Sequence, residues 1–228
     1  MREKIRNLLI WLYSIPINYK VFPKEIARKL PLRISYKTKC KGLYRGCIEI
    51  KCNNIYKGMI QFGMPQGSFG MDMDAPSWLL MEGGARIVFY GPADFSATAS
   101  VRVFENGLLE IKEGFFSNAN ASINVSKRVM IGANAQWGWN VEIIDTDGHD
   151  IKNASGEKIN PDEEIIIGDD VWIGAKASVL KGSVIPDGCI VGYGSIVSKK
   201  YTEPHVVMAG APAKVIKKDI YWCREKSK

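Results

Sequence analysis

The sequence predicts an all-β chain that winds into a three-sided parallel coil, with a short basic helical arm in front and a short tail behind. Three observations support this fold class. Aliphatic residues recur at every sixth position in the C-terminal half, small residues follow them at a fixed distance, and basic residues are concentrated in the first 45 positions. A helix repeats every 3.6 residues and a strand every two, so neither explains a period of six.

The period of six runs through consecutive inward positions occupied by Ile167, Ile173, Val179, Ile185, Val191 and Val197. Four places after each aliphatic residue stands a mostly small one, at Val171, Ala177, Ser183, Cys189 and Ser195. One flat side of a prism accounts for both: the aliphatic residue points inward, the small one packs near a corner, and Gly, Asp or Asn makes the turn. Three sides give an 18-residue coil, and stacked coils pair their backbones about 4.8 Å apart.

The same register returns upstream with larger departures. Inward positions are predicted at Ile131, Trp137 and Ile143 and, after a slip of two residues, at Ile111, Ser117 and Ile123. Trp137 is large for such a position, and core filling is its favoured interpretation. Segments such as RIVFYG and SVRVF read as strands with variable turns, so we expect degenerate coils over residues 46–110.

Residues 1–45 are predicted to form a basic amphipathic arm, because they hold twelve Lys or Arg and two Glu, against 19 basic and 22 acidic residues in the remaining 183. Apolar residues at i, i+3, i+4 and i+7 mark one face of a helix, at Ile5, Leu8, Leu9 and Leu12. The apolar run is too short for a membrane span and lacks a cleavage pattern, so we expect no signal peptide. Two interpretations stay open: the helix packs on its own domain, or it lies on an acidic membrane surface.

The cysteines and overall composition favour a cytoplasmic globular protein. The five cysteines include no C-x-x-C pair, which argues against a disulfide framework and a zinc ribbon. We therefore expect a cytoplasmic location, with peripheral attachment to the cytoplasmic membrane face as the alternative. No nucleic-acid partner is expected.

The segment IIIGDDVWIGAKASVLKGSVIPDGCIVGYGSIVSK, followed by VVMAGAPAKVIKKD, resembles the hexapeptide-repeat acyltransferases. It resembles most the branch that O-acetylates sugars of capsular polysaccharide or lipopolysaccharide. The resemblance extends over residues 131–220 and weakens upstream. It implies a left-handed parallel β-helix over residues 46–228 with a C-terminal tail at 201–228, a homotrimer with sites between subunits, and acetyl-CoA as acyl donor. Handedness rests on the resemblance alone, because the period does not fix it.

One interruption of the period holds a candidate general base. Twenty-four residues, four full periods, separate the inward residues on either side of a loop at 144–166, so the coil resumes in phase after the loop. The loop holds Asp145, Asp147 and His149. Acetyl transfer to an alcohol requires removal of a proton, which a histidine near neutrality is suited to accept. A carboxylate on the other ring nitrogen fixes its tautomer, and we favour Asp147 over Asp145 for this role. The alternative is a histidine that only shields a subunit contact.

Coenzyme A carries an amide arm and phosphates, so its site needs a backbone edge and cations. The resemblance implies that the Gly174-Ala175 turn contacts the arm, with the Ala175 N–H as oxyanion donor. It further implies a donor path lined by Gly174, Ala175, Tyr193, Ser198, Lys199, Lys214 and Lys217. Trp172 is expected to lie outside the prism, near the pantetheine arm of the donor. Tyr193 departs from the family pattern, in which a small residue is usual, and each lysine taken alone also fits a solvated surface charge. For the acceptor sugar we expect contacts with Trp139 and Asn140.

We therefore expect an acetyl-CoA-dependent O-acetyltransferase that acts on a sugar hydroxyl of a surface-polysaccharide precursor by direct transfer in a ternary complex. A covalent route is not expected, because G-x-S-x-G is absent. Metal is not expected either, since zinc enzymes that resemble this repeat need three histidines and the chain has two. The alternatives are an N-acetyltransferase acting on an amino sugar nucleotide and a non-catalytic β-helix scaffold.

Overall fold

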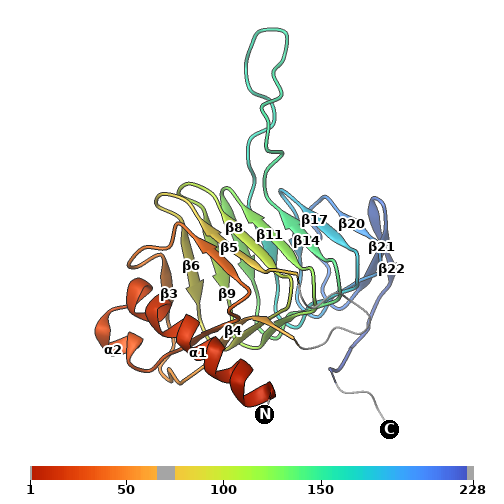
Figure 1. Cartoon of the computed structure of the whole chain (residues 1–228). Coiled ribbons are helices and arrows are strands. Elements are labelled where there is room, and N and C mark those ends of the chain that lie inside the picture. The colour runs from red at the N-terminus through yellow and green to blue at the C-terminus, as the bar shows by residue number, and fades with distance from the viewer. Residues whose placement is uncertain (1, 66–74, 225–228) are drawn as a thin grey trace.

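The computed structural model describes residues 2–65 and 75–224, and its strands form three parallel sheets wound around a common axis (Figure 1). The chain visits sheets A, B and C in turn, and each strand pairs as a rule with the strand three places further along. Each round therefore makes one coil of a three-sided β-helix. The all-β, three-sided parallel coil predicted from the period of six is confirmed.

The strands divide among the sheets as follows. Across sheet A lie β1 (Leu32–Ile34), β4 (Ile60–Met64), β7 (Ala93–Ser96), β10 (Phe115–Ser117), β13 (Gln136–Trp137), β16 (Trp172–Ile173), β19 (Ile190–Val191), β21 (Val207–Gly210) and β22 (Ala213–Lys217). Sheet B holds β2 (Lys39–Lys41), β5 (Trp78–Met81), β8 (Ser100–Val103), β11 (Ser122–Val125), β14 (Glu142–Ile144), β17 (Ser178–Leu180) and β20 (Ile196–Val197). Sheet C holds β3 (Ile48–Ile50), β6 (Arg86–Phe89), β9 (Leu108–Ile111), β12 (Arg128–Ile131), β15 (Ile165–Ile167) and β18 (Val184–Ile185).

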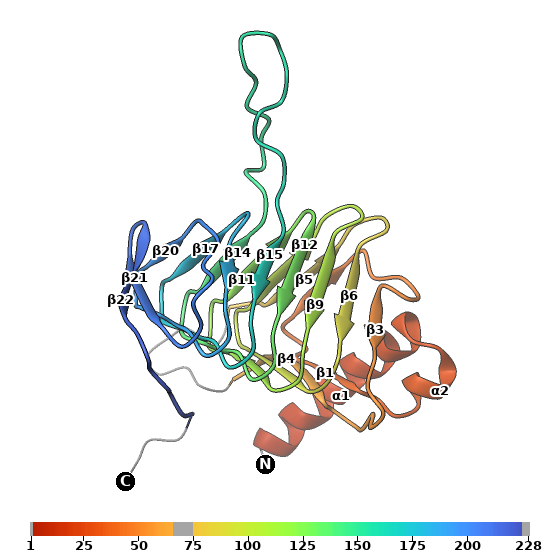
Figure 2. The same ribbon diagram turned by 180° about the vertical axis from the view of Figure 1, so that it is seen from behind.

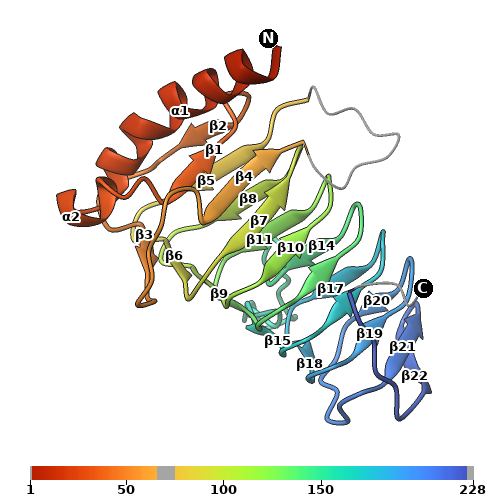
Figure 3. The same cartoon turned by 90° about the horizontal axis from the view of Figure 1, so that it is seen from below.

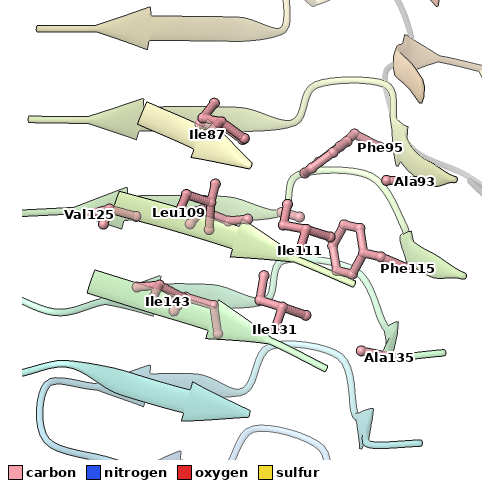
Figure 4. Close-up of a cluster of buried hydrophobic side chains, with 14 of the residues drawn as sticks. Ile87, Ala93, Phe95, Leu109, Ile111, Phe115, Val125, Ile131, Ala135 and Ile143 are labelled. Atoms are coloured by element: carbon pink, nitrogen blue, oxygen red, sulfur yellow. The ribbon is translucent and has the colours of Figure 1, made fainter. Parts of the chain in front are cut away.

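The core is a set of columns in which inward side chains of successive coils stack. In sheet C, Ile131 pairs with Ile167 and Ile167 with Ile185, and all three are fully buried. Figure 4 shows the same stacking for Leu109 and its neighbours in the middle coils. Stacking follows from the period, because residues one coil apart occupy equivalent positions on the same side.

An aromatic column fills the interior beside sheet A. The ring of Phe95 lies 5.0 Å from that of Phe115, and Phe115 meets Trp137 edge-on at 4.9 Å. Trp137 is 1% exposed, which confirms it as a core residue. Small inward neighbours make room for these rings, since Ser117 pairs with Phe95 on one side and with Trp137 on the other.

The upstream coils are longer than the regular ones. Ile173 pairs with Val191, eighteen positions on, whereas Ile87 pairs with Leu109, twenty-two positions on. The additional residues lie in the turns and in strands of up to four or five residues. The register therefore persists while the six-residue count does not, as expected for degenerate coils.

Two helices cover the end of the coil where the chain begins (Figure 3). They are α1 (Arg2–Val21) and α2 (Lys24–Ala27). The predicted division at residue 46 falls after the coil has started, because β1 already pairs with β4 and β2 with β5. In the described parts of the chain, no helix is long and apolar enough to cross a membrane.

The other end of the coil is closed by part of the predicted tail. Strand β21 adds to sheet A in parallel, and β22 returns antiparallel beside it. Between β14 and β15 a long loop projects far from the prism (Figures 1 and 2). It leaves the corner between sheets B and C, which is opposite sheet A.

Candidate functional site

The projecting loop is held at its tip by local hydrogen bonds. Lys152 and Lys158 form an antiparallel bridge, so the loop is a narrow hairpin. At the tip, Asn153 Oδ1 accepts from the N–H groups of Ser155 (2.9 Å) and Glu157 (3.0 Å). These bonds stay within the tip and do not involve the histidine.

The base of the loop is held by a clamp that consists of Asp147, Asn160 and Lys181. Asn160 Nδ2 donates to Asp147 Oδ2 at 2.7 Å and to the His149 carbonyl at 2.8 Å, and its Oδ1 accepts from the Ile151 N–H at 2.7 Å. Lys181, which comes from the next coil, donates to Asp147 Oδ2 at 2.5 Å. The hydrogen bond from Lys181, aided by Asn160, holds the pKa of Asp147 below its ordinary value. The clamp therefore fixes the backbone on both sides of His149.

The His149 side chain is exposed and borders a cavity of about 210 Å³. Acidic and basic groups share the wall, among them Asp150, which pairs with Lys158 at 2.8 Å, and Asp162, which accepts from the Ser126 hydroxyl at 2.7 Å. The imidazole is thus free to meet a ligand that enters from solvent. Its pairing with Asp147 stays a prediction, because in this structure the Asp147 carboxylate accepts hydrogen bonds from Asn160 and Lys181.

Asp145 has a structural contact that differs from the one expected. Its side chain is buried, and its two carboxylate oxygens accept from the backbone N–H groups of Ser126 (2.6 Å), Lys127 (2.8 Å) and Arg128 (2.8 Å) in the preceding coil. Burial raises the pKa of Asp145, and the three N–H donors oppose that shift. Asp145 therefore fixes the corner from which the loop departs instead of orienting His149.

The corner between sheets A and B collects several of the predicted binding residues. Trp139 and Asn140 follow β13, Gly174 and Ala175 follow β16, and Tyr193 follows β19. The turns stack directly on one another. The Lys176 N–H donates to the Trp139 carbonyl at 2.7 Å, and the Gly194 N–H donates to the Ala175 carbonyl at 2.9 Å.

Asn140 has a turn-forming role at this corner. Its φ is +55°, a conformation that asparagine tolerates better than most residues. Its side-chain oxygen accepts from Asn120 Nδ2 at 3.2 Å. A contact with the acceptor sugar stays a prediction for this residue.

The predicted oxyanion donor, the Ala175 N–H, belongs to a half-buried residue where two turns approach closely. Within the described residues it donates no hydrogen bond, and it faces Gly138 of the preceding turn. A Cβ at Gly138 would lie 2.5 Å from the Ala175 nitrogen and 2.7 Å from its Cα, so only glycine allows the two turns to approach this closely. Gly138 is not among the site residues predicted from the sequence. Its place one coil before the Gly174-Ala175 turn is the signal that points to it.

An aromatic groove of about 380 Å³ runs along the outer face of sheet A beside this corner. Trp139, Trp172 and Ala175 line it together with Trp222 from the C-terminal tail. The Trp222 ring lies 6.1 Å from that of Trp172, and its Nε1 donates to the Asp170 carbonyl at 2.6 Å. Trp222 lies outside every repeat, so no sequence pattern places it here.

The remaining predicted donor residues lie elsewhere. Ser198 and Lys199 follow β20 at the corner between sheets B and C, on the same side as the loop. The exposed Lys214 and Lys217 lie on β22 at the end of the coil. Tyr193 is exposed at the A–B corner, and the Lys176 ammonium lies 5.7 Å from its ring centre.

Within one chain the predicted base and the predicted donor edge are therefore apart. His149 belongs to the corner between sheets B and C, while Ala175 belongs to the corner between sheets A and B. The other histidine, His205, is not a second candidate base beside the donor edge. Its ring packs against Tyr221 at 4.6 Å, and its Nδ1 lies against Gly188.

Comparison with protein families and curated proteins identifies related acetyltransferases. A family model described as bacterial transferase hexapeptide (six repeats) matches residues 164–199. Over 112 residues the chain is 36% identical to the galactoside O-acetyltransferase of Escherichia coli (strain K12), an alignment that covers 48% of this chain and 53% of that protein. Over 136 residues it is 30% identical to the "Putative lipopolysaccharide biosynthesis O-acetyl transferase WbbJ" of the same strain, covering 55% and 69%. The chain thus spans about half the length of the first relative and about two thirds of the second.

Comparison with solved structures identifies the same fold. The polysialic acid O-acetyltransferase OatWY superposes with a TM-score of 0.58 at 23% identity, over 79% of this chain and 89% of that one. This likeness, together with the repeat family, confirms the left-handed parallel β-helix.

Proposed function

Because the chain belongs to the bacterial transferase hexapeptide family, we propose that it transfers an acetyl group from acetyl-CoA to a sugar hydroxyl, with His149 as general base. One observation carries the proposal. The clamp of Asp147, Asn160 and Lys181 fixes the backbone around His149 while its imidazole stays exposed beside a cavity. A rigid backbone that presents an exposed imidazole suits a residue that must meet a substrate proton in a defined position.

In the proposed reaction the acceptor hydroxyl oxygen attacks the thioester carbonyl carbon while His149 takes the hydroxyl proton. The Ala175 N–H, which donates no backbone hydrogen bond among the described residues, donates to the oxygen that becomes negative. The carbon–sulfur bond then breaks, and the coenzyme A thiolate takes the proton that the imidazole holds. The acetyl group goes directly from sulfur to oxygen, so the reaction needs no covalent enzyme intermediate.

The separation of His149 from Ala175 within one chain favours a site shared between subunits. A loop that projects from the B–C corner can reach the A–B corner of a neighbouring prism, and cyclic symmetry repeats that contact until the ring closes. We therefore propose a homotrimer in which His149 of one subunit serves the donor edge of the next. Lys199, Lys214 and Lys217 supply cations for the coenzyme A phosphates.

The proposed acceptor is a sugar of a surface-polysaccharide precursor handled in the cytoplasm. Its support is the aromatic groove, since the faces of Trp139, Trp172 and Trp222 offer flat apolar surfaces on which a pyranose ring packs. The names of the two relatives, which specify a galactoside and a lipopolysaccharide, also favour a sugar.

The test is an acceptor screen with labelled acetyl-CoA, comparing the intact protein with His149→Ala. Loss of the general base is expected to lower the turnover rate by about 10² to 10⁴. Ile151→Ala is the matched control, because its side chain is also exposed on the same loop, and it should keep activity close to that of the intact protein. Retention of activity within tenfold by His149→Ala would exclude the assigned role.

Mass spectrometry of the products separates the proposal from its rivals. Sugars with hydroxyl groups alone should be acetylated. Products formed only with amino sugars would favour the N-acetyltransferase, and calorimetry without acetyl-CoA binding at millimolar concentration would favour a scaffold.

A further inference from the structure

The outward face of α1 is apolar. The large hydrophobic side chains on this face are 38–59% exposed, and they recur at helical spacing. They form the stripe made of Ile5, Leu8, Leu9, Leu12, Ile15, Pro16 and Tyr19. A helix on the surface of a globular protein ordinarily turns polar residues toward water, so the stripe is the reverse of the usual arrangement.

The helix does not need this stripe to stay attached to the coil, because another face holds it. The Ile34 N–H donates to Ser14 Oγ at 2.8 Å. Asn18 Nδ2 donates to the Leu32 carbonyl at 2.9 Å, and its Oδ1 accepts from the Leu32 N–H at 3.0 Å. Both side chains are buried and cover the edge of β1. Leu12 and Ser14 project about 160° apart around a helix, so the stripe points away from the coil.

Cations border the stripe on both sides. At 100° per residue, Lys4 flanks one border, and Lys20 and Arg6 flank the other; all three are exposed. Arg6 also lines, with Lys37, a cavity of about 210 Å³ beside the helix. Exposed basic residues continue into the segment after the helix, at Lys24, Arg28 and Lys29. The charge around the stripe is therefore strongly positive.

We propose that the stripe of α1 is a docking surface for an anionic lipid membrane. The apolar side chains enter the boundary between headgroups and acyl chains, and the flanking cations meet the lipid phosphates. A second copy of this chain fits the surface less well. Two stripes packed face to face would bring their rows of cations together, and like charges at that distance repel.

The proposed trimer, on which this step rests, makes the docking multivalent. The helix covers one end of the coil (Figure 3). A three-fold axis along the coils carries all three ends to the same side, so three stripes face one plane. One interfacial helix binds reversibly and weakly, whereas three linked ones bind with avidity. A membrane-bound trimer would hold its A–B corners beside acceptors that are themselves attached to lipid.

The test is flotation of the full chain with vesicles of phosphatidylcholine, with and without phosphatidylglycerol. The chain is expected to float with the anionic vesicles at low salt and to be released at high salt. Leu12→Gln is expected to lower the bound-to-free ratio about tenfold, and Lys20→Gln about fivefold. Ile216→Gln is the matched control, because Ile216 is 64% exposed on β22 at the far end of the coil, and it should float like the unaltered chain.

Three results would overturn the docking proposal. They are failure of the unaltered chain to float with anionic vesicles, equal flotation of Leu12→Gln, and a change of oligomeric mass in Leu12→Gln on ultracentrifugation, which would make the stripe a contact between copies. Thermal melts check that Leu12→Gln folds. Flotation requires no acetyl-CoA, so it succeeds or fails independently of the proposed acetyl transfer.

Discussion

Asn160 joins the two sides of the loop base, so its removal tests whether the clamp serves His149. Asn160→Ala deletes two hydrogen bonds to backbone, to the His149 carbonyl and from the Ile151 N–H. Each contributes about 1 kcal/mol, which makes about 2 kcal/mol for the pair. The bond to Asp147 adds little, since that carboxylate is exposed and solvent screens it. If every turnover needs the clamped loop, kcat/KM falls about thirtyfold.

Steady-state acetyl transfer with an acceptor from the screen measures this loss, and circular dichroism follows the melting temperature. We expect Tm to change little, because the loop projects away from the core. Asn153→Ala is the matched control: it also removes hydrogen bonds to two backbone N–H groups in the same loop, but at the tip. Equal losses of kcat/KM in the two variants, or none in Asn160→Ala, would refute a positioning role for the clamp.

The further predictions concern two cysteine thiols and two tryptophans. Burial raises the pKa of Cys40 to about 11, so its thiolate fraction at pH 8 is about one in a thousand and its alkylation rate should rise about tenfold per pH unit; a flat pH profile, seen by peptide mass spectrometry, would contradict this. A saturating acceptor sugar should slow alkylation of the exposed Cys223, which lines the aromatic groove, and an unchanged rate would remove the acceptor from that groove. Trp137→Ala should cost about 3–5 kcal/mol in urea unfolding because the ring is fully buried. Trp139→Ala should lower the free energy of unfolding far less, because Trp139 is half-buried, and it should raise the KM for the acceptor. Equal losses of unfolding free energy in the two variants would contradict the assignment of Trp137 to the core and Trp139 to the groove.

The sequence by itself determined the coil and the place of the loop. Inward residues such as Ile131, Ile167 and Ile185 were identified from the period, because neighbours in a column are always one coil apart and each hexapeptide side is a local unit. The same count placed the loop, since its length is a whole number of periods. Trp137 was assigned to the core by the same register.

Only the tertiary structure decided what touches the loop, the tail and the helix. Asp145 precedes His149 by four residues, yet its carboxylate binds backbone N–H groups some twenty residues earlier. Lys181 reaches Asp147 from the next coil, and Trp222 folds back onto the face of Trp172. The loop and the tail lie outside the repeat, so the period does not encode the contacts that they make with the coils.

The arm shows the same division within one helix. The spacing of apolar residues in residues 1–21 predicted an amphipathic helix but not which face meets the coil. The open edge of β1 offers unpaired N–H and C=O groups, and Ser14 and Asn18 satisfy them where leucine cannot. The face that carries Ser14 and Asn18 therefore meets the coil, where Ile10, Ile17 and Val21 are buried with them, and the apolar stripe stays outside.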